Sequence, residues 1–304
     1  MSVINKSTVD GNLVEALAQS FSEYSDGVQY AVKDAFPEIL VTSTTGQFPI
    51  YVRENALQID DIEKAPGSLP KETNIYVETG TWSAKHISLS TVVPDGQNVF
   101  GFNAHDAAIK TLWSKIWAWK ESKFASQLFG AGVTSTSTSG NLRTDVNVAK
   151  NKVYAASGLV PNALIISYPA LQKLLNSSDF LEMFPGFGVL TEQQRLLNLP
   201  SIFGLQRLIV STAAYSPDAA PLDVTTVNSI LPSDEFAVAV VAENGSDLSA
   251  PSAGRTFKVA PSESRPFELT SVYDAIRAAT IHTIHMDLDI RLIDGKMAHR
   301  ITGI

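Results

Sequence analysis

The side chains best placed for metal chemistry lie close to the C-terminal end of the sequence. From Thr283 to Leu292 apolar and polar residues alternate, which is the period of a half-buried strand. This alternation puts His285, Asp287 and Asp289 on one face, where an imidazole and two carboxylates could bind a divalent cation. Arg291 follows on the same face and could neutralise both carboxylates without a metal. Since polar side chains commonly line the wet face of such a strand, we expect a solvated polar face here.

Two further groups of potential ligands are less suitable. His282 and His285 have the i, i+3 spacing of some helical metal sites, but in a strand this spacing puts them on opposite faces. Asp60, Asp61 and Glu63 could bind Ca²⁺, yet the run lacks the spacing and the glycine of an EF-hand loop. We expect these three carboxylates to be solvated or paired with lysines of a neighbouring subunit.

Motifs of nucleotide binding and nucleophilic catalysis are missing. The sequence has no P-loop motif and no Gly-x-Ser-x-Gly nucleophile elbow. Pro185-Gly-Phe-Gly188 begins like a dinucleotide-binding fingerprint, but Thr191 occupies the third glycine position and no strand leads in, so a tight loop is expected. The absence of cysteine excludes thiolate nucleophiles, thiolate metal sites and disulfides. We therefore expect no enzyme, with no catalytic, cofactor-binding or metal-binding residue.

The strongest helical pattern covers residues 104–129. It has apolar residues, three of them tryptophans, at three- and four-residue spacings, and begins after Asn103. Four lysines are scattered around it: Lys110, Lys115, Lys120 and Lys123. Stacking of nucleic-acid bases on the tryptophans is one interpretation, but lysines that snorkel from a packed helix fit the spacing better. We expect nearly every side of this helix to be covered, as in a central spine.

Composition limits the remaining classes of function. The 304 residues carry 23 Lys plus Arg against 31 Asp plus Glu, a net charge of −8, so sequence-specific DNA binding is disfavoured. The longest apolar run, residues 236–242, is far shorter than the roughly 20 residues of a membrane span. Residues 1–20 are polar and acidic and do not resemble a secretory signal. A globular chain without a membrane partner is expected.

The N-terminal third predicts segments that need a neighbour. Residues 1–40 hold two weak helical stretches, 13–21 and 28–36, without a continuous apolar stripe, and should form an arm that buries its apolar side chains on another subunit. Strands are predicted at 47–53 and 87–93. The roughly 20 irregular residues between them, 54–73, are too long for the tip of a compact hairpin, so they should be either disordered or laid across a partner.

The rest of the chain predicts a polar loop, an α/β region and a closing strand. Residues 132–141 read as a mobile low-complexity loop, followed by a helix from Asp145 to Ser157. Between 159 and 245 short apolar strands alternate with helices, which indicates one α/β subdomain. The expected elements there are strand 163–166, a helix capped by Ser167, a helix from Thr191 that ends before Pro200, and strands 205–210 and 235–242.

The order of these elements resembles the major capsid proteins of tailed bacteriophages of the Hong Kong ninety-seven type. The resemblance spans residues 40–304 and rests on local motifs in order: Ala65-Pro-Gly-Ser68, His86-Ile-Ser-Leu-Ser-Thr-Val-Val-Pro-Asp95, the helix end with Glu121, Ala125, Leu128 and Phe129, Gly158-Leu-Val-Pro-Asn-Ala-Leu-Ile-Ile166, the helix Leu171–Leu175, Leu199-Pro-Ser-Ile-Phe-Gly-Leu-Gln-Arg-Leu-Ile-Val210, and Pro251-Ser-Ala-Gly-Arg-Thr-Phe257. Some relatives crosslink subunits through a loop lysine. Lys64 and Lys71 lie in the matching loop, but the asparagine and activating acid have no match, so no crosslink is inferred.

The resemblance implies an α+β phage capsid fold with four parts. These are an N-terminal arm (1–40), an extended loop (41–100), a peripheral domain with the spine helix (101–158 and 263–304) and an axial α/β domain (159–262). It implies a virion protein, assembled in the host cytoplasm, that forms hexamers and pentamers of an icosahedral head. A portal protein, a scaffold and decoration proteins are its implied partners, with packaged DNA contacted non-specifically at most. The alternative is the shell protein of a cellular nanocompartment with the same fold.

Overall fold

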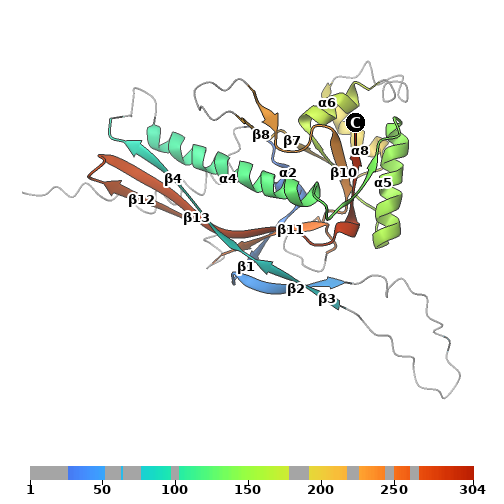
Figure 1. The fold of residues 1–304 in the computed structure, drawn as a ribbon, viewed down its shortest axis with the longest axis horizontal. Helices are drawn as coiled ribbons and strands as arrows, with labels where there is room; N and C mark the ends of the chain where they lie inside the picture. The colour runs from blue at the N-terminus through green and yellow to red at the C-terminus, as the bar shows by residue number, and fades with distance from the viewer. Residues whose placement is uncertain are drawn as a thin grey trace, which may run out of the picture.

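The chain folds as an α+β protein around two sheets, as seen in a computed structural model (Figure 1). The structure describes residues 27–51, 63, 77–96, 103–177, 192–217, 226–243, 250–260 and 267–304. No helix within these ranges is long and apolar enough to cross a membrane.

The first sheet, here called the long sheet, is organised around strand β13 (Ala279–Leu292). On one edge β13 pairs, from Ala279 to Leu288, with the whole length of β4 (Lys85–Pro94). On the other edge it pairs first with β12 (Glu268–Asp274) and then with β11 (Gly254–Val259), and β1 (Glu38–Val41) adds in parallel to β11. Fourteen consecutive residues of β13 therefore connect segments from both ends of the chain.

Helix α4 (Ala104–Leu128) lies along one face of the long sheet (Figure 1). The Asn103 side chain caps it by accepting from the backbone N–H groups of His105 and Asp106, so the predicted start is confirmed. Its apolar side, with Leu112 and Trp113, packs in one core with Ile284 and Met286 of β13. Each such buried side chain contributes about 1.5–3 kcal/mol to the hydrophobic term.

The opposite side of α4 is open within the subunit. Thr111, Lys115, Ser122, Lys123 and Ser126 are all exposed among the described residues. The expectation of a helix covered on nearly every side is therefore wrong. Trp113 and Trp117 are buried on the core side, whereas Trp119 lies on another side of the helix and is only partly buried, with Lys123 Nζ 5.7 Å from its ring centre. Three tryptophans on one helix therefore did not require burial all round.

The second sheet, here called the small sheet, has the order β5-β14-β10-β6-β7. Its strands are β5 (Thr134–Ser137), β14 (Ala298–Thr302), β10 (Glu235–Ala239), β6 (Ala163–Ser167) and β7 (Arg207–Ser211). Helices α5 (Leu142–Ser157), α6 (Tyr168–Leu175) and α8 (Glu192–Ile202) contribute to its second core, with Val146, Leu171 and Leu199 fully or almost fully buried. Short elements complete the fold: α2 (Ala31–Ala35), β2 (Thr45–Tyr51), β3 (Val77–Ser83), the β8–β9 pair (Ala214–Tyr215 with Asn228–Ser229) and the 3-10 turn η2 (Gly295–Met297).

The predicted helix ends around the small sheet agree only in part with the structure. Helix α5 ends at Gly158, whose φ of 69° is the left-handed conformation that favours glycine, and Ser167 caps α6 through the Ala170 N–H. Helix α8 continues through Pro200 to Ile202, so the expected end before Pro200 is wrong. The proline removes a backbone donor only two residues before the helix ends, which confines its cost to the last turn.

Two segments predicted to be irregular or dependent on a neighbour belong to the chain's own body. Within residues 28–36, Val32 and Phe36 are buried in the subunit core, so this part of the predicted arm does not need another subunit. Residues 1–26, including the predicted helix 13–21, lie outside the described residues. Residues 134–137 of the predicted mobile loop form β5, which pairs in parallel with β14. Pairing with β14 makes a strand of this Ser/Thr run, which has no alternation of apolar and polar residues to indicate one.

The predicted hairpin also has a different partner strand. Strand β2 pairs with β3, which the sequence did not indicate, while the predicted strand 87–93 belongs to β4 and pairs with β13. The side chains of Ile87, Leu89 and Val93 do face the core side of β4, as their alternation predicted. The expected tip at 54–73 lies outside the described residues except for Glu63, which is exposed.

Candidate assembly surface

The two faces of β13 have different surroundings. Ile284, Met286, Leu288 and Ile290 are buried against the core with α4, which confirms the predicted inner face. The other face, here called the outer face of the long sheet, has two parts. The β2–β3 hairpin covers the part formed by β1 and β11, and the part formed by β4, β13 and β12 is open among the described residues.

The covered part is a small aromatic core. Phe257 of β11 is fully buried, with the Phe48 ring 5.3 Å and the Trp82 ring 5.0 Å from it, centroid to centroid, in stacked orientation. The Ser83 N–H donates to Asp289 Oδ2 of β13 over 3.0 Å. These contacts fix the root of the hairpin on the long sheet, and with it the direction in which the chain leaves at Tyr51 and returns at Val77.

The hairpin register is set by two glycine–aromatic pairs. Gly46 lies opposite Trp82, and Phe48 lies opposite Gly80. A Cβ atom added at Gly46 would lie 2.1 Å from the Trp82 ring, and one added at Gly80 would lie 2.2 Å from the Phe48 ring. Each ring therefore occupies the space that a side chain on the opposite strand would need.

The open part of the outer face carries a row of β-branched residues. Val92 of β4 and Val272 of β12 both lie opposite Ile281 of β13, so the three side chains share the outer face. Val272 and Val92 are exposed, with Val272 61% accessible. Such a cross-strand apolar row in contact with water is typical of a binding surface.

The turn between β12 and β13 extends this surface. Ile276 is 98% exposed on a turn in which Asp274 Oδ1 accepts from the N–H groups of Ile276 and Arg277. Ala278 has a φ of +45°, which a residue other than glycine adopts only at a cost, and its carbonyl accepts from the Asp95 N–H over 2.8 Å. An isoleucine held on a constrained turn in full contact with water is suited to insertion into a partner.

The predicted cation ligands are separated by other contacts. Asp287 Oδ1 lies 2.8 Å from His86 Nδ1, and Asp289 accepts from Ser83 and lies 3.8 Å from Arg291 Nη1. Arg291 therefore neutralises only one of the two carboxylates, and His86, which the sequence did not single out, contacts the other. His285 shares the face with Asp287, as predicted, but its ring stacks on the ring of His86. Within the described ranges no cluster of three potential ligands is arranged for a metal ion.

Other sequence candidates fall where the structure makes no statement. Asp60, Asp61, Lys64 and Lys71 of the predicted loop lie outside the described residues, as does Pro185-Gly-Phe-Gly188.

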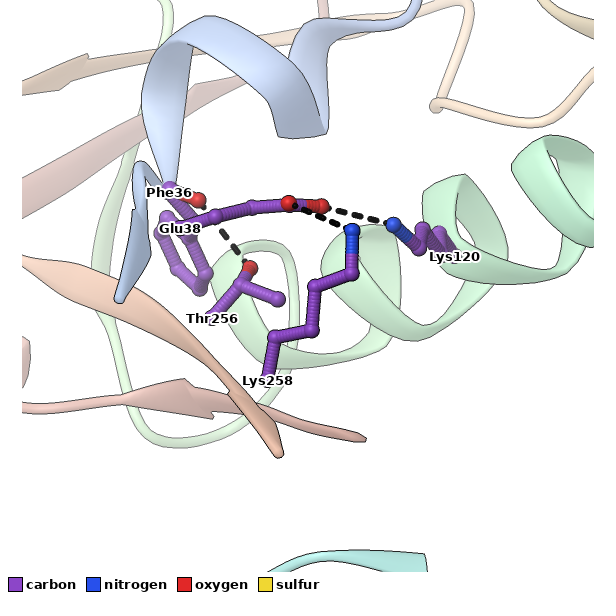
Figure 2. A network of polar contacts seen from close by, with 5 residues as sticks. All are labelled: Phe36, Glu38, Lys120, Thr256 and Lys258. Atoms are coloured by element: carbon purple, nitrogen blue, oxygen red, sulfur yellow. Dashed lines mark hydrogen bonds and ion pairs between the residues drawn. The ribbon is translucent and has the colours of Figure 1, made fainter. Parts of the chain in front are cut away.

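Lys120 is the one lysine of α4 that the sequence placed wrongly. Its side chain is 2% exposed and does not snorkel, because Nζ lies 2.7 Å from Glu38 Oε1 and 4.1 Å from the Trp117 ring centre. Lys258 Nζ lies 3.2 Å from the other oxygen of Glu38. Figure 2 shows both ammonium groups converging on this carboxylate, beside the hydrogen bond from Thr256 Oγ1 to the Phe36 carbonyl. We call Glu38, Lys120 and Lys258 the charged triad.

The charged triad joins β1, α4 and β11 through one carboxylate shared by two ammonium groups. Partial burial acts to raise the pKa of Glu38, but the two lysines and their hydrogen bonds outweigh it and lower that pKa to about 2. For Lys120, burial lowers the pKa while attraction to Glu38 raises it, with a net lowering. The lowered pKa of Glu38 keeps the triad charged as the pH falls toward 2, so β1 stays joined to α4 and β11 well into the acidic range.

Glu121, next to the triad on α4, holds helix α2 by a different route. Its carboxylate is fully buried, and its two oxygens accept from the N–H groups of Ala31 at 3.0 Å and Val32 at 2.9 Å. Burial raises the pKa of Glu121, against hydrogen bonds from Ser211 and from these two backbone groups. This carboxylate satisfies donors at the start of α2 that have no partner within the helix.

Comparison with known proteins gives a fold. Neither a protein-family model nor a curated protein matches the sequence. A phage-related protein from Bordetella bronchiseptica RB50 is 18% identical with a TM-score of 0.68, over 94% of this chain and 95% of that one. A virus-like particle from Pyrococcus furiosus is 10% identical with a TM-score of 0.56, over 97% and 100%. The mature capsid of bacteriophage PhiM1 is 10% identical with a TM-score of 0.54, over 90% and 86%. The chain therefore has the Hong Kong ninety-seven-type fold predicted from the sequence.

Proposed function

We propose that this chain is the major capsid protein of a tailed bacteriophage with double-stranded DNA. The supporting observation is that its likeness to a mature phage capsid runs over 90% of this chain and 86% of that one. The protein forms hexamers and pentamers of an icosahedral head and has no enzymatic activity. A portal protein, a scaffold and decoration proteins complete the particle, which is assembled in the host cytoplasm.

The open outer face of the long sheet serves as a contact between subunits. A two-stranded ribbon is barely stable alone in water, so the β2–β3 hairpin needs a surface beyond its own root. The row Val92, Ile281 and Val272 offers an apolar surface of the required kind, and Ile276 extends it. In this assignment the part of residues 1–40 before the buried segment 28–36 acts as the arm, 101–158 and 263–304 as the peripheral domain, and 159–262 as the axial domain around which the subunits of a capsomer gather.

The distribution of charge fits a shell around packaged DNA. The chain has a net charge of −8, so a wall built from many copies repels phosphates at long range. Contact with the genome is then weak and independent of sequence. A strongly basic wall would hold DNA and oppose its packing and release.

A cellular nanocompartment shell is the second candidate. The virus-like particle from Pyrococcus furiosus has the same fold over its whole length, which favours considering it.

Electron microscopy of the purified full-length protein, and of particles that contain it, tests the proposal. Closed icosahedral shells with hexameric and pentameric capsomers are expected, and double-stranded DNA inside them distinguishes a virus from a nanocompartment. A small closed oligomer under all conditions, even with a scaffold supplied, would refute both candidates. Deletion of residues 56–72 tests the loop separately, since normal yields of closed shells from that variant would exclude its role in assembly.

A further inference from the structure

The first turn of α4 is joined to the long sheet by two histidines. His105 Nδ1 lies 2.8 Å from His282 Nε2, and the rings meet edge to face with centroids 5.1 Å apart. The other nitrogen of His282, Nδ1, lies 2.8 Å from the Ser271 hydroxyl of β12. A continuous chain of hydrogen bonds therefore runs from α4 through β13 to β12.

This geometry limits how many protons the pair can hold. Two ring nitrogens 2.8 Å apart share a single hydrogen, because one must donate and the other must accept. The pair can thus be neutral or carry one charge. A second added proton would place two N–H groups and two positive charges against each other, and the contact would break.

The surroundings of His282 disfavour charge. The residue is 5% exposed, and burial, followed by repulsion from His105, lowers its pKa. Charged or titratable groups occur on the elements around it, and none of those described forms an ion pair with it: Asp106 and Lys110 on α4, Glu268, Tyr273 and Asp274 on β12, and His285 on the opposite face of β13. Strand β4 contributes no charged residue between Ile87 and Val93.

We propose that the His105–His282 pair is an acid-sensitive contact that releases the first turn of α4 from the β12–β13 hairpin as the pH falls. Because His282 binds a proton less readily in the closed contact than in water, protonation favours the open form. The contact is intact at pH values above the ordinary pKa of histidine and is lost as the pH falls below that pKa. At acidic pH the equilibrium constant for opening is larger by a factor of ten for each unit by which the pKa of His282 in the closed contact lies below its pKa in the open form.

The contact controls the segment that carries Val272 and Ile276. Both residues lie on the β12–β13 hairpin, beyond the point where Ser271 and His282 connect it to α4. Opening would free this hairpin to change its angle against the helix while the charged triad still holds the other end of α4. The inference rests on contacts within one subunit, so it can hold or fail independently of the proposed function.

Hydrogen exchange of the full-length protein, kept as unassembled subunits, tests the contact. Amides in residues 103–112 and 268–285 should lose protection between pH 7.5 and pH 5.0, after correction for intrinsic exchange. His282→Gln keeps an acceptor for His105 but cannot titrate, so it should abolish that loss. The matched control is His86→Gln, which removes an exposed histidine of the outer face and should leave the loss unchanged.

Two results would overturn the proposal: equal protection of the wild type at both pH values, or a loss of protection that persists in His282→Gln. Should that variant fold poorly, His105→Asn provides the same test from the helix side. His299 is a second buried histidine with a pKa lowered mainly by burial, but it lies in the small sheet beside Thr134 and Thr136. Exchange of β5 and β14 reports on it separately.

Discussion

Replacing Glu38 by glutamine should destabilise the subunit by removing the negative charge of the charged triad. Glutamine keeps the shape and one acceptor oxygen but leaves Lys120 and Lys258 facing each other. Lys120 has no route to water, since its side chain is 2% exposed. An uncompensated buried ammonium group is the expected result, and such broken pairs typically cost about 3–5 kcal/mol.

The electrostatics of Glu38 give a second route to the magnitude. Its pKa falls from the usual 4.5 to about 2, which corresponds to about 3 kcal/mol of preference for the charged form in the folded protein. The side chain is 31% exposed, so solvent screens part of this interaction. We expect Glu38→Gln to lower the free energy of unfolding by about 2–4 kcal/mol at neutral pH. As the folded pKa is lowered, the contribution is present above pH 4.5 and is lost as the pH falls toward 2.

Urea unfolding of unassembled subunits, with a double-mutant cycle, measures this effect. Lys120→Met removes the buried charge and keeps an apolar stem beside Trp117, so the double variant should recover a large part of the loss. Glu78→Gln, an exposed carboxylate on β3, is the control and should stay within about 0.5 kcal/mol of the wild type. A loss below 1 kcal/mol in Glu38→Gln, or no recovery in the double variant, would refute the reasoning.

Three further changes probe the hairpin, the helix attachment and the surface. Gly80→Val should detach the β2–β3 root from the long sheet, because the valine Cβ would lie 2.2 Å from the Phe48 ring. Limited proteolysis should then cleave the hairpin of the variant, and a variant that resists cleavage would contradict the packing described. The wild type should lose stability relative to Glu121→Gln as the pH rises above about 4.5, because the raised pKa of Glu121 in the folded protein favours its protonated form. Urea midpoints of the two proteins that change in parallel with pH would exclude this effect. Ile276→Asp should leave the thermal midpoint of the subunit unchanged but prevent shell formation, as measured by light scattering. Lys115→Asp, on the exposed side of α4, is the control and should assemble normally. Normal assembly of Ile276→Asp would show that Ile276 is not part of the interface.

Local periodicity predicted what each segment does by itself. The alternation in 283–292 identified both faces of β13, and the spacing in 104–129 located α4 and its cap at Asn103. These features depend on residues a few positions apart, so the sequence states them directly. The assignment of a polar face instead of a metal site around His285 is likewise a local argument.

Local periodicity did not predict contacts between residues that are far apart in the sequence. Lys120 looked like a snorkelling lysine because its partner Glu38 lies 82 residues away. His105 and His282 are 177 residues apart, and neither one indicates the other. Strand β5 is a run of serine and threonine that becomes a strand only because β14 offers it an edge. A parallel neighbour of this kind has no local signature, and so residues 132–141 were read as a loop.

The two glycine–aromatic pairs of the β2–β3 root also act as a check on strand alignment. If β2 slipped by one residue against β3, Phe48 and Trp82 would each face a residue with a side chain in place of glycine, and the rings would lose their seats on Phe257. The wrong register of β2 against β3 is therefore destabilised by Gly46, Phe48, Gly80 and Trp82 within the subunit, without any contact with a second molecule. The 25 residues from 52 to 76 therefore do not have to set the register of β2 against β3. Their composition and number can change in evolution while β2 still ends at Tyr51 and β3 still begins at Val77.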